Sequence, residues 1–122
     1  MASSDQESVL DLETIATLKE LGGDDDPDLF TELVDLFVTD AKVQIAELRR
    51  ALREGDLRLL ERTAHTLKSS CGNVGALTMS KLCFEIEQLG RASKLDGAGP
   101  LVERTAEQYE RVQVALNQQK GA

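Results

Sequence analysis

The chain has 122 residues, of which 41% are hydrophobic and 30% charged, and its formal net charge is −8. This length fits one domain. The negative charge argues against nucleic-acid binding, which needs a basic surface, and against binding to an anionic membrane. No apolar run approaches the ~18 residues of a membrane span, and the first residues, MASSDQESVL, lack the features of a signal peptide. We therefore expect a cytoplasmic globular protein that neither binds nucleic acid nor inserts into a membrane.

The first predicted elements are two helices. Residues 1–7 are expected to be disordered, and apolar residues spaced by three then predict a short amphipathic helix. Its expected inward stripe consists of Leu12, Ile15, Leu18 and Leu21. The Gly22–Gly23 pair ends this helix, because glycine adopts the left-handed cap at little cost. Asp26 as N-cap and Pro27 as first helical residue then predict a long second helix over roughly 27–53.

Three more helices follow at short intervals. Asp56 is the predicted N-cap of the third helix, and the segments GNVG at 72–75 and DGAGP at 96–100 separate the third, fourth and fifth helices. Short connections between long amphipathic helices make them antiparallel neighbours. Residues 8–120 are therefore predicted to form one all-α domain, an antiparallel up-down four-helix bundle with a short additional N-terminal helix across one end.

His65, the only histidine of the chain, lies on the polar face of the third helix. At ~100° per residue, the buried stripe consists of Leu57, Leu60, Ala64, Leu67 and Cys71. The opposite face consists of Arg58, Glu61, Arg62, His65, Lys68, Ser69 and Gly72. Three basic residues and one acidic residue make this face locally cationic. His65 is therefore expected to be exposed, with Lys68 one turn away on the same solvated surface.

Three chemical roles of this histidine can be compared. A metal site needs several ligands at suitable spacing, whereas there is no second histidine, and Cys71 and Cys83 are expected to be reduced core thiols. A hydrolytic triad needs a nucleophile and an orienting acid; Ser69 is one turn away, but no acidic residue follows within reach. A phosphoryl acceptor needs an exposed imidazole, a nearby cation and room for a partner. The face around His65 offers all three.

An imidazole of this kind depends on a partner protein. A charge pair at ~4 Å is worth about 4 kcal/mol at an effective dielectric constant of about 20, so Lys68 can orient and stabilise a phosphoryl group. It cannot replace the Mg²⁺ and aspartate chemistry of phosphoryl transfer, and the sequence has no glycine-rich nucleotide loop. We therefore expect a phosphoryl carrier with no cofactor or metal of its own and no autonomous kinase or hydrolase activity.

The segment AHTLKSSCGNVGA at 64–76 resembles the signature of histidine-containing phosphotransfer (HPt) domains, written HxLKG followed by small residues and GA. The resemblance covers roughly 10–118. It implies that His65 is phosphorylated and that Lys68 stabilises the phosphoryl group. It also implies a relay between a histidine kinase or hybrid sensor kinase and the receiver-domain aspartate of a response regulator, with Mg²⁺ supplied by the receiver. Ser69 stands where the family most often has glycine.

The expected docking surface surrounds His65. Its residues are Arg58, Arg62, Ser69, Gly72, Phe84, Glu87 and Arg91. The resemblance implies Glu87 and Arg91 as polar positions of the fourth helix, and helical spacing puts them with Phe84 on its outward face. Ser69 and Gly72 leave clearance for a partner. The alternative function is a non-catalytic interaction module that docks a partner through the same basic face, and in either case a monomer is expected.

Overall fold

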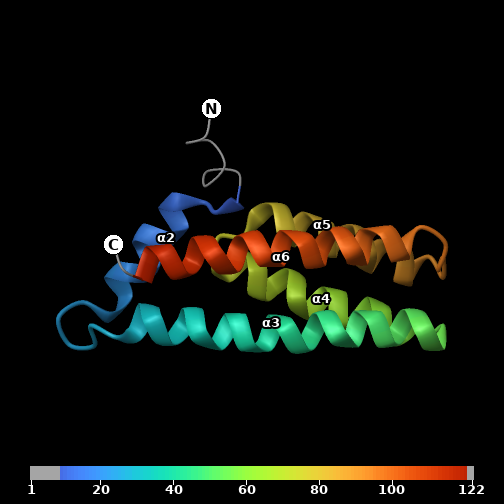
Figure 1. Cartoon of the computed structure of the whole chain (residues 1–122), viewed down its shortest axis with the longest axis horizontal. Coiled ribbons are helices and arrows are strands. Elements are labelled where there is room, and N and C mark those ends of the chain that lie inside the picture. Colours follow the sequence, from blue (N-terminus) through green and yellow to red (C-terminus); the bar gives the residue numbers. More distant parts are fainter. Residues whose placement is uncertain (1–8, 121–122) are drawn as a thin grey trace.

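The computed structural model describes residues 9–120, and the segment expected to be disordered, 1–7, lies outside this range. The described residues form only helices: α2 (Leu12–Gly22), α3 (Leu29–Glu54), α4 (Leu57–Asn73), α5 (Leu77–Arg91) and α6 (Ala98–Lys120) (Figure 1). Helices α3 to α6 run up and down, each packed against the next, and α6 also packs against α3. The predicted four-helix bundle is therefore confirmed. None of the helices in the described part combines the length and the apolar character that a membrane span requires.

One hydrophobic core runs through the bundle. The inward stripes repeat every three or four residues, as amphipathic helices do; Ile45 and Leu48 of α3 and Leu60 and Leu67 of α4 are all buried. Fully burying one such side chain contributes about 1.5–3 kcal/mol. The stripes therefore hold the helices together and leave the polar face of α4, with His65 at its centre, toward solvent.

Two predicted helix starts have different outcomes. The Leu59 amide donates a hydrogen bond to Oδ1 of Asp56 (3.0 Å), so Asp56 caps α4 as predicted. The predicted start of α3 at Asp26 and Pro27 is wrong, because the Leu29 amide donates to the Asp26 carbonyl oxygen (3.2 Å) in a turn and the helix begins only at Leu29. A residue that favours caps also favours turns, and here the turn is formed.

Helix α2 packs across one end of the bundle and is tied to the loop between α4 and α5 (Figure 1). The Asp11 amide donates to the Gly75 carbonyl oxygen (2.7 Å). Gly75 has a φ of 76°, and a Cβ there would lie 3.0 Å from the Asp11 carbonyl oxygen, so this turn needs glycine. The expected inward stripe of α2 is wrong in part: Ile15 is buried, but Leu12 and Leu21 are exposed, because only a narrow side of α2 meets the bundle.

Helices α4 and α5 make the most extensive contact in the bundle, and Gly90 lies within it. A Cβ on Gly90 would lie 2.9 Å from the backbone nitrogen of Glu61, which is closer than side chains normally pack. The absence of a side chain at Gly90 therefore lets α5 approach α4. This close approach brings the polar residues of the two helices within hydrogen-bonding distance.

Candidate functional site

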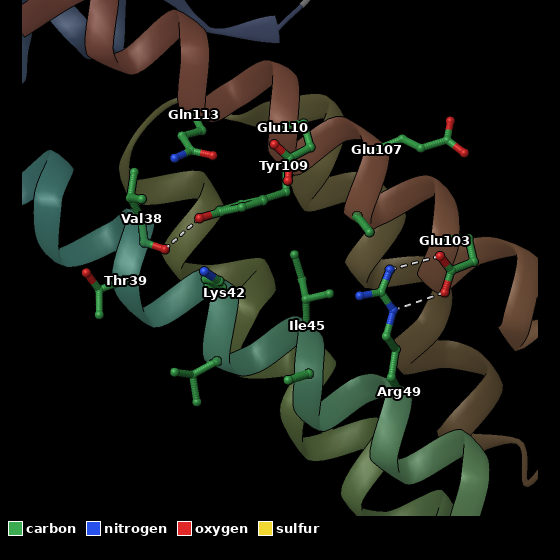
Figure 2. Close-up of a pocket in the computed structure, with 13 residues that line it drawn as sticks. Val38, Thr39, Lys42, Ile45, Arg49, Glu103, Glu107, Tyr109, Glu110 and Gln113 are labelled. Carbon is green, nitrogen blue, oxygen red and sulfur yellow. Dashed lines mark hydrogen bonds and ion pairs between the residues drawn. The ribbon is translucent and has the colours of Figure 1, made fainter.

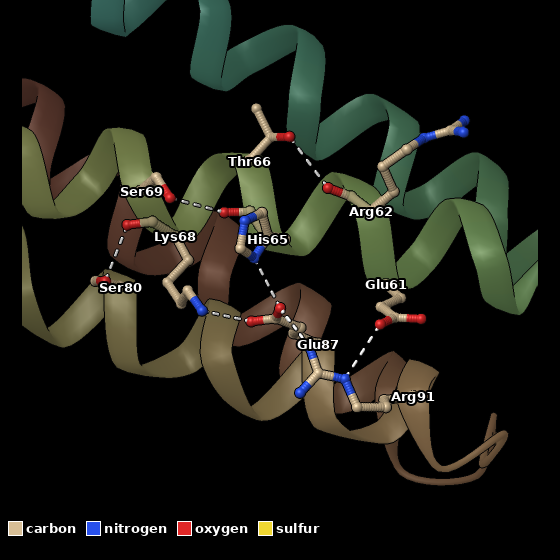
Figure 3. A network of polar contacts seen from close by, with 9 residues as sticks. All are labelled: Glu61, Arg62, His65, Thr66, Lys68, Ser69, Ser80, Glu87 and Arg91. Atoms are coloured by element: carbon tan, nitrogen blue, oxygen red, sulfur yellow. Dashed lines mark hydrogen bonds and ion pairs between the residues drawn. The ribbon is translucent and has the colours of Figure 1, made fainter.

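His65 lies in the middle of α4, and its side chain is 60% exposed, as the sequence predicts. The ring leans toward α5 (Figure 3). Its Nδ1 atom lies 2.8 Å from Oε2 of Glu87, a residue of α5. The other ring nitrogen, Nε2, lies across the ring from this contact. An exposed imidazole held at one nitrogen is the central feature of this face.

Glu87 is buried beneath His65, although helical spacing predicts it on the outward face of its helix. Its side chain is only 2% exposed, and its carboxylate accepts hydrogen bonds from three sides (Figure 3). Lys68 Nζ donates to Oε1 (2.6 Å), and both His65 Nδ1 and Arg91 Nη2 (3.1 Å) lie against Oε2. Glu87 is also an acidic residue within reach of His65, although the sequence around the histidine predicts none. The prediction of an outward Glu87 is therefore wrong.

The surroundings of Glu87 keep its carboxylate charged. Burial raises the pKa of Glu87, but the hydrogen bonds from Lys68 and His65 lower it by more, so the pKa ends below its ordinary value. An ionised carboxylate is a pure acceptor, so the Nδ1 atom of His65 is assigned the hydrogen of this contact. In the neutral imidazole, Nε2 then keeps its lone pair.

Lys68 is one turn from His65, as predicted, but it is not freely solvated. Its side chain is 27% exposed and is paired with Glu87. Its ammonium also lies over the half-exposed ring of Phe84, 5.3 Å from the ring centroid, a cation–π distance. The Ser80 hydroxyl donates to the Lys68 carbonyl oxygen (3.0 Å) and adds a further link between α4 and α5. The cation is therefore held in place beside the histidine.

The rim of the site contains the remaining residues of the expected surface. Arg91 bridges Glu87 to Glu61, donating through Nε to Glu61 Oε2 (3.2 Å). Arg58 and Arg62 are exposed on α4. The sequence pattern did not reveal the bridge, because it joins two helices whose contact distance is set by Gly90.

Ser69 is exposed one turn beyond His65, and Gly72 follows it on α4. Nothing lies within 4 Å of a Cβ built on Gly72. The exposed Ser69 hydroxyl donates to the His65 carbonyl oxygen (3.3 Å), a bond within the helix backbone. It is therefore directed at the main chain rather than at the imidazole, which leaves the hydrolytic arrangement without its nucleophile.

Cys71 and Cys83 are buried free thiols. The neighbouring Cys83 thiol and burial raise the pKa of Cys71, so it is a poor thiolate and an inert core residue. Within residues 9–120, no group of three or more histidine, cysteine, aspartate or glutamate side chains is arranged to hold a metal ion. The chemistry of this face therefore centres on His65 and its charged neighbours.

Known proteins are similar to this chain in both sequence and fold. The model of the Hpt domain family matches residues 32–115. Multistep phosphorelay regulator 1 of Schizosaccharomyces pombe is 30% identical over 73% of this chain, which spans only 30% of that regulator's length. Histidine-containing phosphotransfer protein 2 of Arabidopsis thaliana is 27% identical over 91% of this chain and 72% of its own.

Two solved structures have the same fold. The histidine-containing phosphotransfer protein HptB from Pseudomonas aeruginosa PAO1 superposes with a TM-score of 0.85 at 30% identity, over 93% of this chain and 95% of its own. A rice protein described as a putative histidine-containing phosphotransfer protein superposes with a TM-score of 0.81 at 23% identity, over 95% of this chain and 84% of its own. The family match covers more than half of the chain and includes α4 and α5 entirely. The chain belongs to the Hpt domain family.

Proposed function

We propose that this protein is a histidine phosphotransfer protein that accepts a phosphoryl group on Nε2 of His65 and relays it. The observation that carries the proposal is the contact of 2.8 Å between His65 Nδ1 and the buried Glu87 carboxylate, on a ring that is otherwise exposed. This contact orients the ring and leaves Nε2 as the nucleophile. The family match, and relatives named for phosphorelay and phosphotransfer, support the same function.

In the proposed step, the Nε2 lone pair attacks the phosphorus atom of an aspartyl phosphate on a receiver domain. A nitrogen–phosphorus bond forms while the phosphorus–oxygen bond to the aspartate breaks, and its electron pair leaves on the carboxylate. Nδ1 keeps its hydrogen, and the Glu87 carboxylate balances the positive charge that develops on the ring. The reverse step returns the phosphoryl group. The receiver is expected to supply Mg²⁺, so the chain needs no metal of its own for this role.

Lys68 is the proposed stabiliser of the phosphoryl group. In the resting protein its ammonium is bound to Glu87. Phosphorylation adds negative charge beside that carboxylate, and an ammonium with three donors can bind both acceptors. Arg58, Arg62 and Arg91 are proposed to dock the acidic surroundings of a partner's active site, together with Phe84. Because Glu87 is buried, it is not proposed as a docking residue; its proposed role is to support His65.

The proposed partners are the receiver domain of a response regulator and a histidine kinase or hybrid sensor kinase. The protein is proposed to meet them as a cytoplasmic monomer. The two buried free thiols, Cys71 and Cys83, suit a reducing compartment. The net charge of −8 disfavours self-association through mutual repulsion. Analytical ultracentrifugation at several protein concentrations tests this, and the measured mass should stay that of one chain.

The test is phosphoryl uptake from phosphoramidate and, separately, from a phosphorylated receiver domain with Mg²⁺. We expect a single acid-labile, base-stable phosphate per chain, located by mass spectrometry on the peptide that contains His65. The variant His65→Gln should keep the helical circular dichroism and lose this phosphate, because the chain has no other imidazole. Normal labelling of His65→Gln would refute the proposal. Receiver binding without any transfer would indicate the non-catalytic interaction module instead.

A further inference from the structure

A long groove lies between α3 and α6 (Figure 2). Its volume is about 960 Å³. Along α3 it extends from Val38 to Arg49, and along α6 from Glu103 to Gln113, about three helical turns or 16 Å on each side. No part of the mechanism proposed above uses this groove.

One large side chain and two small ones shape the groove. The Tyr109 hydroxyl of α6 donates to the Val38 carbonyl oxygen of α3 (2.8 Å) and spans the distance between the helices. Ala46 and Ala106 line the groove farther along and are too small to fill it. The buried Tyr109 ring and Ile45 form the floor, Ala106 is partly buried, and Ala46 lies at the exposed edge. The groove therefore lies along the contact between two helices of the bundle rather than at its end.

The groove and His65 lie on opposite faces of the bundle. The order of packing around the bundle is α3, α4, α5 and α6, with α6 returning to α3. His65 and Glu87 belong to the contact of α4 with α5, whereas the groove belongs to the contact of α3 with α6. A protein in the groove would therefore leave the phosphorylation face accessible.

The two rims of the groove carry opposite charge. Arg49 of α3 binds Glu103 of α6 through two hydrogen bonds (3.1 and 2.9 Å) and neutralises that end of the groove. In the rest of the groove, Lys42 lies on the α3 rim and Glu107 and Glu110 on the α6 rim. Burial raises the pKa of the Tyr109 phenol and the Glu110 carboxylate raises it further, as expected beside a negative rim. The open part of the groove thus has an apolar floor and an excess of negative charge on α6.

We propose that the α3–α6 groove binds an amphipathic helix of a partner protein, with apolar residues on the floor and lysine or arginine residues along the α6 rim. Three turns of helix match its length, and helix-in-groove recognition uses apolar anchors three or four residues apart. Glu107 and Glu110 are three residues apart along α6, which matches the spacing of neighbouring side chains on one face of a bound helix. This partner binds at the same time as a receiver on the opposite face.

A second copy of this chain fits the groove less well. Each copy carries a net charge of −8, so bringing two together opposes like charges. A basic helix is instead attracted by the charge of the whole molecule and by the α6 rim. The net charge alone would attract any cationic peptide to any face, so the test must separate the groove from the rest of the surface.

The probe is a synthetic amphipathic helical peptide of three to four turns, with leucines on one face and lysines along one flank of that face. Its control has glutamates in place of those lysines. Binding to the full chain is measured by isothermal titration calorimetry near physiological ionic strength, where distant charges are screened. We expect the lysine peptide to bind and the glutamate peptide to bind at least about tenfold more weakly.

Two double variants separate the groove from general charge. The double variant Glu107→Lys with Glu110→Lys should weaken binding of the lysine peptide at least about tenfold and strengthen binding of the glutamate peptide. Glu20→Lys with Glu85→Lys changes the net charge equally at exposed positions of α2 and α5 and should leave the difference between the peptides intact. Ala46→Trp fills the groove and should abolish binding of the lysine peptide. Circular dichroism checks that each variant is folded.

Four results would overturn the proposal: no binding, equal loss in both double variants, binding that survives Ala46→Trp in a folded protein, or competition by a bound receiver. A concentration-dependent dimer that Glu107→Lys with Glu110→Lys disrupts would identify a second copy as the occupant instead. Phosphoryl uptake from phosphoramidate serves as the independent readout. It should be the same with and without peptide, so failure of this proposal is distinguishable from failure of the phosphotransfer function.

Discussion

The Glu87 carboxylate connects polar side chains of α4 and α5. It is buried, yet His65, Lys68 and Arg91 all contact it. A buried carboxylate costs free energy unless it is paired and hydrogen-bonded, and these contacts meet that condition. The same arrangement fixes the position of each cation. Glu87, which stabilises the resting site, therefore also orients the imidazole that we propose as the nucleophile.

The structure changes the expected effect of removing Lys68. Replacing a fully solvated lysine by alanine changes the free energy of unfolding by no more than about 0.5 kcal/mol. Lys68, however, donates to a buried carboxylate (2.6 Å). We therefore expect Lys68→Ala to lower the free energy of unfolding by about 1.5–3 kcal/mol, as for the loss of a hydrogen bond to a charged group. Denaturant unfolding measures this change.

The matched control is Lys81→Ala on the exposed surface of α5. It should change the free energy of unfolding by no more than about 0.5 kcal/mol. Equal destabilisation by the two variants would contradict the role assigned to the Lys68–Glu87 pair. Phosphoryl transfer to and from a receiver should slow in Lys68→Ala and stay unchanged in Lys81→Ala.

The stability contributed by Glu87 should depend on pH. Its pKa in the folded protein is lowered, chiefly because the hydrogen bonds from Lys68 and His65 outweigh burial. The contribution is therefore fully present above the unfolded-state pKa of about 4.3 and is lost as the pH falls through the lower folded value. The free energy of unfolding of the parent chain should exceed that of Glu87→Gln near pH 6, and the difference should shrink toward pH 3.

Glu85→Gln is the control for this measurement, because it removes the same charge from an exposed position two residues away. Urea unfolding at several pH values gives the difference for each variant. Identical pH profiles for Glu87→Gln and Glu85→Gln would show that the ionised Glu87 does not stabilise the fold.

Residue-level prediction from sequence succeeded where one helix contained the whole signal. His65 and Lys68 belong to the same turn-to-turn spacing of α4, and the exposure of His65 is confirmed. The role of Glu87 was missed because its partners lie on a neighbouring helix, whose angle and distance no helical period specifies. A glutamate flanked by Ile86 and Gln88 gives no sign that an imidazole and two cations will contact it.

At the scale of elements, the site depends on how closely α4 and α5 approach. Gly90 permits this approach, because its Cβ would collide with the backbone of Glu61 (2.9 Å). Gly72, also in a helix, has open space where its Cβ would be. The two glycines therefore serve different purposes: one permits packing, and the other lies beside the open approach to His65.

The variants Gly90→Ala and Gly72→Ala test this distinction. Alanine favours a helix by up to about 1 kcal/mol over glycine, so Gly72→Ala should raise the free energy of unfolding by up to that amount. Gly90→Ala should lower it by about 1–3 kcal/mol, because overpacking outweighs the gain. Denaturant unfolding of both variants measures the changes. Stabilisation of Gly90→Ala would mean that the helices can separate without loss.

Helix number and order could be predicted because each helix has its own apolar stripe. Some boundaries could not. The signal at Asp26 and Pro27 forms a turn instead of starting α3, and α6 begins at Ala98, inside the segment expected to separate it from α5. Pro100 fits the first turn of α6, because the first amides of a helix need no partner within it. Cap, turn and break signals use the same residue types, so tertiary packing decides between them.

At the scale of the whole molecule, we expect the exposed face around His65 to determine which phosphoryl donors can reach it. Ser69 is exposed one turn beyond His65. We expect Ser69→Trp to fold, to accept phosphate from the small donor phosphoramidate, and to fail with a receiver domain, whose aspartate must approach the imidazole closely. Phosphate incorporation from each donor measures the two reactions.

Asn117→Trp, at an exposed position of α6, is the matched control and should react with both donors. Exchange of Ser69→Trp with a receiver at the parent rate would show that clearance at Ser69 is unimportant. Loss of both reactions in a folded Ser69→Trp would mean that Ser69 shapes the histidine itself.

Tyr109, the side chain that spans the distance between α3 and α6, has a practical consequence. Tyr109 is the only tyrosine, the chain has no tryptophan, and His65 is the only histidine. Intrinsic fluorescence therefore comes from Tyr109 alone, and its emission responds to the Val38 hydrogen bond and to Glu110 beside it. The imidazole resonances in a nuclear magnetic resonance spectrum come from His65 alone. The native chain thus carries one optical reporter and one magnetic reporter on opposite faces, and each face can be followed without a label.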